Sequence, residues 1–275
     1  MYKGVNLSEI FRVTAFYSAF SADFSSTYSF KGEYHNFYEL VFVTKGAIGV
    51  AAGNDIYILN KGQAIIHEPM EFHSLWSENN MNSSVIVISF GADNLPEYSA
   101  KVFNIDEEDD FKGVFSLISS AFVINKDYVV DVNEASGNMY IMAVKAFEMF
   151  MLKMISRNPG KRSRVESESA EKFSKIISAL ENNIHKNLLV SDIAEMCNMS
   201  ESSVKKTFSR YMGTGIMYHF NKLKVTAAIS MLENGMSVCE ISNALGFQHQ
   251  NYFSTVFKRI TGHSPTVYRN TKMWG

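Results

Sequence analysis

The chain has 275 residues, 46% of them hydrophobic and 20% charged, which is a globular composition long enough for about two domains and excludes a disordered or fibrous protein. Its two cysteines, Cys197 and Cys239, are too few and too far apart for a disulfide framework or a four-ligand zinc site. The longest apolar stretch, residues 139–155, contains three charged side chains, whereas a membrane span needs about 20 nearly uninterrupted apolar residues. Residues 13–22 imitate a signal peptide only weakly. We therefore expect a cytoplasmic protein without a membrane anchor.

The net charge of −2 conceals two halves of opposite sign. Residues 1–160 contain 11 Lys+Arg and 19 Asp+Glu, whereas residues 161–275 contain 15 and 9, so the halves carry −8 and +6. A basic half joined to an acidic one is expected where only the second binds a polyanion, although chance clustering is an alternative. Pro159 and Gly160, in a basic and Ser-rich stretch, interrupt any helix there. We expect a first domain over residues 1–157, a linker over 158–168 and a second domain over 169–275.

The first half changes its hydrophobic period partway along. Short strand-like runs separated by Gly and Asn turns occupy residues 38–44, 56–59, 64–66 and 85–90. Such runs indicate an antiparallel barrel or sandwich, and we expect a small barrel. After residue 106 the pattern becomes helical, with an apolar face made by Phe111, Val114, Phe115, Ile118 and Phe122.

A Met-rich helix follows at residues 135–157 and is apolar on nearly all sides. Such a helix must be covered on more than one side. Either it packs only on the barrel, or one face covers the barrel and the other meets a second copy of the chain. We favour the second arrangement and therefore expect a homodimer.

Two motifs within the predicted barrel resemble those of the cupin superfamily over about 60 residues: His35, Glu39 and Gly46, then Gly62, Pro69 and His73. In that family, three His and one Glu bind a metal, because imidazole and carboxylate suit divalent first-row ions. Here Glu33 stands at the first His position, and the spacing after Pro69 is one residue short. His35, Glu39 and His73 could still form a three-ligand set, but we expect a pocket for a small molecule and no metal. The side chains expected to line that pocket are His35, Tyr38, Glu39, Phe72, His73 and Trp76.

The second half repeats itself at an offset of 48 to 49 residues. The matched pairs are Val190 with Val238, Asp192 with Glu240, Ile193 with Ile241, Val204 with Phe253, Phe208 with Phe257, Arg210 with Arg259 and Gly213 with Gly262. Each copy predicts a short helix, a turn and a second helix, over residues 191–197 and 201–211, then 238–245 and 248–260. Two helices joined by a tight turn are typical of a helix-turn-helix, whose second helix can enter the major groove.

Local signals support this prediction. Ser237 and Glu240 form an S-x-x-E capping box at the start of the second copy, and Gly246 supplies the backbone freedom that a sharp turn needs. Residues 216–233 predict one helix that links the copies. Its length would set the spacing of the two reading helices.

Residues 241–269 closely resemble the DNA-binding signature of the AraC/XylS family of transcriptional regulators. The segment reads ISNALGFQHQNYFSTVFKRITGHSPTVYR, and the first copy agrees at Ile193, Ala194, Ser200, Phe208, Gly213, Ala228, Met231 and Leu232. The likeness covers about 100 residues and departs at Ile216, His219 and Lys224, where the family usually has Pro, Tyr and Arg. The resemblance implies a sequence-specific regulator, more often an activator, that binds double-stranded DNA and acts on RNA polymerase. It also implies a first domain that senses a small-molecule effector or dimerises.

Helix geometry selects the side chains that could read DNA, because positions three or four apart share a face. Val204 and Phe208, and Phe253 and Phe257, would point inward. The opposite faces offer Lys for guanine and Asn or Gln for adenine, although a solvated face is the alternative for each. The expected base contacts are Ser202, Lys205, Lys206, Ser209, Gln250, Asn251, Ser254, Thr255 and Lys258. The expected phosphate contacts, which position the protein without specifying sequence, are Arg210, Lys224, Arg259 and Arg269.

The sequence therefore predicts an α+β protein: an antiparallel barrel with helices, then an all-α domain with two helix-turn-helix motifs. We expect a transcriptional regulator with neither catalytic residues nor a cofactor. One alternative is a metal-dependent cupin enzyme with a DNA-binding appendage, and another is a regulator without an effector.

Overall fold

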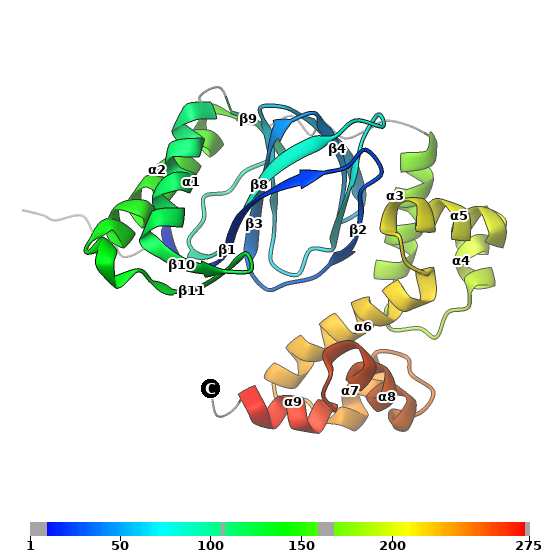
Figure 1. Ribbon diagram of the computed structural model, residues 1–275. Coiled ribbons are helices and arrows are strands. Elements are labelled where there is room, and N and C mark those ends of the chain that lie inside the picture. Colours follow the sequence, from blue (N-terminus) through cyan, green and yellow to red (C-terminus); the bar gives the residue numbers. More distant parts are fainter. Residues whose placement is uncertain (1–9, 106–107, 159–167, 273–275) are drawn as a thin grey trace, which may run out of the picture. The chain divides into compact units, whose positions relative to one another are not determined.

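The computed structural model describes residues 10–105, 108–158 and 168–272, and the chain divides into two compact units, residues 1–165 and 166–275 (Figure 1). The linker predicted over residues 158–168 lies outside the described residues except at its two ends. Each unit is described by itself below.

The first unit contains two antiparallel sheets. The seven-stranded sheet has the order β10-β11-β1-β8-β3-β6-β9, with β1 at Arg12–Phe24, β3 at Tyr38–Lys45, β6 at Gln63–His67, β8 at Ser83–Asp93, β9 at Val102–Asn104, β10 at Phe122–Asn125 and β11 at Tyr128–Val132. The four-stranded sheet has the order β2-β7-β4-β5, with β2 at Ser29–Glu33, β4 at Ala47–Ala52, β5 at Asp55–Asn60 and β7 at His73–Ser77. The helices of this unit are α1 at Glu108–Ala121, the 3-10 helix η1 at Glu134–Ser136 and α2 at Met139–Arg157.

The seven-stranded sheet is buried on both faces. Because side chains alternate along a strand, Val41 and Val43 of β3 face the smaller sheet, whereas Leu40 and Phe42 face the helices. One apolar core, including Ile48, Val50 and Leu75, fills the space between the sheets. A second core packs α1 and α2 against the outer face of the large sheet, as Figure 1 shows. The unit is therefore a three-layer arrangement of helices, large sheet and small sheet.

The predicted α+β class is confirmed, but the strands do not close into a barrel. Consecutive strands β3 and β4 belong to different sheets, and only Gly46 lies between them. Its φ of 71° is the left-handed conformation that glycine adopts without strain. The chain thus crosses between the sheets in one residue.

Several strands were not predicted. Residues 13–22, whose apolar run weakly imitates a signal peptide, lie in β1, the longest strand, which pairs with β8 and β11. The predicted helical face included Phe122, which was wrong for that residue. Helix α1 ends at Ala121, and Phe122 begins the β10–β11 hairpin. Phe111, Val114 and Ile118 are buried as expected. Strands β2, β4, β7 and β9 were also missed, because their short, polar or small-residue sequences give no strong alternation.

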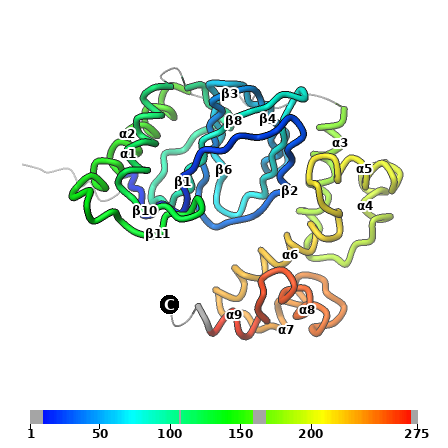
Figure 2. Tube along the Cα trace, in the orientation of Figure 1, coloured from blue at the N-terminus to red at the C-terminus, as the bar shows by residue number. Residues whose placement is uncertain are grey.

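The second unit is entirely helical. Its helices are α3 at Glu168–Glu181, α4 at Val190–Met196, α5 at Glu201–Met212, α6 at Ile216–Glu233, α7 at Val238–Ala244, α8 at Gln250–Thr261 and α9 at Pro265–Lys272. The linking helix matches its predicted bounds, and α4–α5 and α7–α8 form the two predicted helix-turn-helix motifs, with α6 between them (Figure 2). Helices α3 and α9 were not predicted. No helix in the described part of the chain is both long and apolar enough to cross a lipid bilayer.

Candidate nucleic-acid interface and effector site

The first helix-turn-helix presents a polar face on α5. Ser200 caps the helix, accepting a hydrogen bond from the Ser203 amide at 3.2 Å, and so fixes where the helix starts. Val204 and Phe208 are fully buried, as predicted. The opposite face is exposed and carries the four predicted side chains: Ser202, Lys205, Lys206 and Ser209.

The second helix-turn-helix is built in the same way. The predicted capping box is present, since Ser237 Oγ accepts from the Glu240 amide and Glu240 Oε2 accepts from the Ser237 amide. Phe253 and Phe257 of α8 are fully buried in the core with α6. Ser254 is half-buried, and the other predicted side chains of α8 are exposed: Gln250, Asn251, Thr255 and Lys258.

Some of these exposed groups already have partners. Lys205 Nζ lies 3.1 Å from Glu201 Oε2, and Thr255 Oγ1 donates to the Asn251 carbonyl. Within the described residues, the side chains of Lys206, Gln250 and Asn251 themselves make no hydrogen bond or ion pair, and only the backbone carbonyls of Lys206 and Asn251 accept one from a side chain. These three can meet a base edge without first breaking an internal contact.

The predicted phosphate contacts divide into two groups. Arg210 and Arg259 are exposed at the C-terminal ends of α5 and α8, where a backbone phosphate could reach them. Arg269 is half-buried, and its Nη2 donates to the Met236 carbonyl at 2.6 Å, which ties α9 to the segment before α7.

Lys224 does not occupy the exposed position that a phosphate contact requires. Only 3% of the residue is exposed, and Nζ donates to the carbonyls of Lys186 at 2.7 Å and Leu245 at 2.8 Å. The ammonium also lies over the rings of Phe220 and Phe247, and burial lowers the pKa of Lys224 to about 8. The structure makes it an internal donor that joins α6 to the loop between α3 and α4 and to the turn after α7.

In the first unit, three predicted pocket residues come together. One ligand atom from each of His35, Glu39, His73 and Glu33 lies within 4.8 Å of the others. Glu39 lies near the start of β3 and His73 at the start of β7, so the cluster joins the two sheets at one end of the sandwich. Sequence reasoning treated Glu33 as a departure from the motif, but the structure includes it in the cluster.

The charge of this cluster is centred on Glu39. Burial alone would raise its pKa, but interactions with His73, His67 and His35 lower it to about 2. Ser89 Oγ donates to Glu39 Oε2 at 3.0 Å and is in turn 2.6 Å from Ser18 Oγ, so a hydroxyl chain orients the carboxylate. Glu39 is therefore a buried, oriented anion.

The histidines respond to this anion differently. Burial lowers the pKa of His73, but the adjacent Glu39 outweighs burial and raises it overall. Burial and His73 together lower the pKa of His35, and that of the fully buried His67, which sequence reasoning missed, falls well below its usual value. His67 pairs across the sheet with Glu39 and stacks on His73 at 4.1 Å between ring centroids.

The structure separates the aromatic members of the predicted pocket from this cluster. Tyr38 packs on the helix-facing core, and Trp76 lies over Gly49 on the outer face of the small sheet. Each is next to a residue that faces the space between the sheets, and successive residues of a strand face opposite sides. Phe72 covers Gly32 and contacts the Tyr34 ring at 5.0 Å between centroids. The six side chains predicted to line one pocket therefore do not all lie together in the structure.

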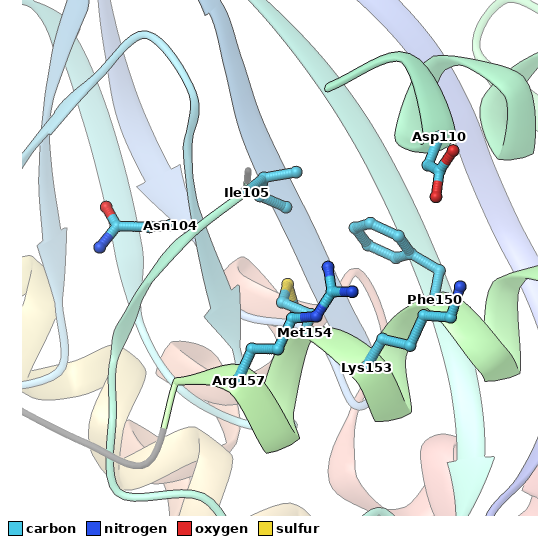
Figure 3. Close-up of a pocket in the computed structure, with 7 residues that line it drawn as sticks. All are labelled: Asn104, Ile105, Asp110, Phe150, Lys153, Met154 and Arg157. Carbon is cyan, nitrogen blue, oxygen red and sulfur yellow. The ribbon is translucent and has the colours of Figure 1, made fainter. Parts of the chain in front are cut away.

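A small cavity of about 30 Å³ lies elsewhere in this unit, where α2 passes the segment after β9 (Figure 3). Phe150, Lys153, Met154 and Arg157 of α2 line one side, and Asn104, Ile105 and Asp110 line the other. An organic ligand needs a space of several hundred Å³, so this cavity holds no more than water-sized guests as it stands.

Comparison with known proteins identifies both units. Residues 193–271 match a helix-turn-helix domain family, and residues 18–111 match the AraC-like ligand binding domain family. The HTH-type transcriptional activator RhaR of Mannheimia succiniciproducens is 24% identical over 246 residues, which are 86% of each chain. The Msm operon regulatory protein of Streptococcus mutans is 26% identical over 261 residues, 88% of this chain and 87% of that protein.

A solved structure, unsaturated fatty acid bound ToxT from Vibrio cholerae, is 17% identical and aligns over 94% of this chain and 96% of its own, with a TM-score of 0.37. The curated relatives are named as regulators of transcription. Together with the family matches, they favour a transcriptional regulator over the metal-dependent enzyme.

Proposed function

Because the chain belongs to the AraC family of transcriptional regulators, we propose that its two helix-turn-helix motifs enter successive major grooves on one face of double-stranded DNA. One observation carries the proposal. Helices α5 and α8 each bury one apolar face and leave a hydrogen-bonding face exposed, and α6 packs with both motifs. One helical unit thus offers two reading surfaces with a fixed separation.

Base reading rests on Lys206 in the first motif and on Gln250 and Asn251 in the second. Lys recognises guanine O6 and N7, and Asn or Gln recognises adenine N6 and N7. Ser202, Lys205, Ser209, Ser254, Thr255 and Lys258 complete the two faces. Arg210 and Arg259 contact phosphates and set the register of the helices without specifying sequence.

Selection of binding sites from a random duplex pool by the full-length protein tests this assignment. We expect a site with two blocks about 10 base pairs apart, since that is one helical turn of DNA. Lys206→Ala relaxes one block and Asn251→Ala the other, each at a cost of about 1–3 kcal/mol for the preferred base.

Two matched controls separate base reading from general effects. Lys175→Ala removes the same charge from the exposed side of α3, and Asn243→Ala removes an exposed amide from α7, the non-reading helix of its motif. Both should select the wild-type site. Enrichment of no sequence at all, or relaxation of both blocks by either control, would contradict the proposal.

The first unit supplies control in this proposal. The match to a ligand binding domain supports a small-molecule effector there, and the exposed apolar side of α2 supports a homodimer. A ligand that binds one arrangement of the dimer better than another shifts the equilibrium between them. We propose activation through RNA polymerase, as the name of the RhaR relative suggests.

A further inference from the structure

We propose that the Tyr252 ring of α8 contacts the C5 methyl group of one thymine in the block of DNA that Asn251 reads. The inference rests on the proposed function, because it needs α8 in the major groove. It adds an apolar contact to the hydrogen-bonding face already described. Apolar contact with the thymine methyl is one of the ways in which proteins distinguish base pairs in that groove.

The core of the second unit does not account for the position of Tyr252. The residue is 54% exposed, whereas Phe253 and Phe257 on the inner side of α8 are fully buried. Within the part of the chain that the structure describes, its phenol oxygen makes no hydrogen bond. An aromatic side chain of this size contributes little to stability at an exposed position, so its ring is available to a ligand.

Tyr252 borders the face of α8 that is proposed to read bases. It lies in the first turn of the helix, directly after Asn251 and three residues before Thr255. Residues three apart share a side of a helix, so the ring lies beside the exposed Thr255. The first residues of a recognition helix are the ones that contact base edges, and Tyr252 is therefore placed where such contacts are made.

The turn before α8 supports the ring from one side. The ring of Phe247 is 6.0 Å from that of Tyr252 between centroids and 5.2 Å from that of Phe253. Phe247 is only 8% exposed, and the Lys224 ammonium lies 4.8 Å from its centroid on a buried side. A side chain that already rests on a fixed neighbour has less freedom to lose when it meets DNA.

The base proposed for Asn251 brings a methyl group into the same groove. Asn recognises adenine N6 and N7, and the thymine paired with that adenine carries its C5 methyl on the major-groove side. A hydrogen-bonding side chain gains nothing from this methyl, whereas an aromatic ring that covers it removes apolar surface from water. Neighbouring residues of α8 thus match neighbouring features of A·T pairs.

The first motif has no such ring. The repeat offset of 49 residues matches Tyr252 with Ser203 of α5, which is half-buried and whose amide donates to the Ser200 cap. We therefore expect this methyl contact in the block read by α8 and no counterpart at the matched position of α5.

Duplexes that lack single methyl groups test the inference. Each thymine of the site selected by the full-length protein is replaced in turn by deoxyuridine, which keeps the hydrogen-bonding groups and removes only the methyl. One such duplex, altered in the block that depends on Asn251, should bind the wild type about fourfold more weakly, the effect of burying one methyl group. Tyr252→Ala should bind the unaltered duplex about fourfold more weakly and respond no further to that substitution. Tyr252→Phe should behave as the wild type does.

Tyr218→Ala is the matched control, because it removes an exposed tyrosine from α6 and should keep the wild-type response. The deoxyuridine series with wild-type protein needs no variant, so the test holds even if Tyr252→Ala unfolds. A selected site at which no deoxyuridine weakens binding would overturn this inference alone. So would a deoxyuridine effect that persists in folded Tyr252→Ala, or equal losses in Tyr252→Phe and Tyr252→Ala, which would indicate a hydroxyl contact with a phosphate. Selection of no site would contradict the proposed function as well.

Discussion

Lys224 shows that a cation within a DNA-binding unit can serve the fold instead of the ligand. Its ammonium donates to two carbonyls from different segments and lies between two aromatic rings. The lowered pKa shows that burying this charge has a cost, which the two hydrogen bonds offset. The sequence could not reveal this, because a lysine at that position of a helix reads equally well as a surface charge.

Lys224→Met tests the internal role. It keeps most of the side-chain volume but leaves the Lys186 and Leu245 carbonyls without their donor. We expect the free energy of unfolding to fall by about 1–3 kcal/mol in urea titrations, because buried acceptors lose their partner. Lys206→Met, on the exposed face of α5, should change it by less than about 0.5 kcal/mol. Unchanged stability with weaker DNA binding would instead make Lys224 a phosphate contact.

Position 246 requires glycine for two reasons, its backbone conformation and the atoms packed against it. Its φ is 65°, and a Cβ would lie 2.3 Å from the His185 carbonyl oxygen. Gly246→Ala should therefore destabilise the protein by more than about 2 kcal/mol. Gly235 has a φ of 82° but no atom within 4 Å of a Cβ, so Gly235→Ala should cost only about 1 kcal/mol. Equal losses in thermal unfolding would rule out the close approach as the cause.

His219 makes stability depend on pH. Burial, with a smaller effect from Lys222, lowers its pKa to about 3, whereas in the unfolded chain it titrates near 6.5. Between these values the unfolded state binds more protons, so stability falls as the pH drops below about 6.5 and is unaffected above it.

The width of this pH range below 6.5 sets the expected loss of stability. Between pH 7.5 and pH 5, the wild type should lose about 2 kcal/mol more than His219→Gln, at about 1.4 kcal/mol per pH unit below 6.5. Urea unfolding of both proteins, followed by circular dichroism, measures this difference because their other titrating groups are the same. Parallel pH profiles would contradict the assignment.

At the scale of elements, regular periodicity decided what the sequence could predict. Helices α5, α6 and α8 combine a 3.6-residue pattern with caps or glycine ends, and their predicted positions agree closely with the structure. The His35, Glu39 and His73 cluster was also anticipated. Glu33 was not, because a β-bulge changes which residue faces inward and leaves no periodic signal. Tyr38 adjoins Glu39 in a strand and therefore faces the other side of the sheet, and Trp76 lies in β7, a strand that was not predicted.

Helix α2 has an apolar side that the described residues leave exposed. Ala143, Phe147 and Met151 are fully buried against the large sheet, whereas Met142 and Met149 are 62% and 55% exposed. A flexible thioether surface suits contact with a second copy of the helix, which is the dimer we propose.

The double variant Met142→Lys, Met149→Lys should shift the protein from dimer to monomer in sedimentation velocity without changing its circular dichroism. Desolvating four charges at a twofold interface is unfavourable, while the exposed positions tolerate Lys in the monomer. Met81→Lys changes an exposed methionine in another part of the unit and should leave the dimer intact. A double variant that remains dimeric would exclude this face.

At the scale of the whole molecule, the two halves of the sequence, residues 1–160 and 161–275, carry opposite net charge. The half with a charge of +6 contains both helix-turn-helix motifs, and the half with −8 contains the sheets and the His–Glu cluster. The positive half attracts the DNA backbone, and the negative half opposes contact of the first unit with it. In the function that we propose, specific reading depends on two helices held at one spacing by α6.

The central claim is that both motifs read one face of the same duplex. The most direct test is the affinity of the full-length protein for its selected site when five base pairs are inserted between the two blocks. Half a helical turn moves one block to the opposite face of the DNA, so we predict a loss of at least tenfold, largely restored when the insertion is placed outside both blocks. Undiminished affinity with the insertion between the blocks would contradict the account and would leave a single motif as the reader.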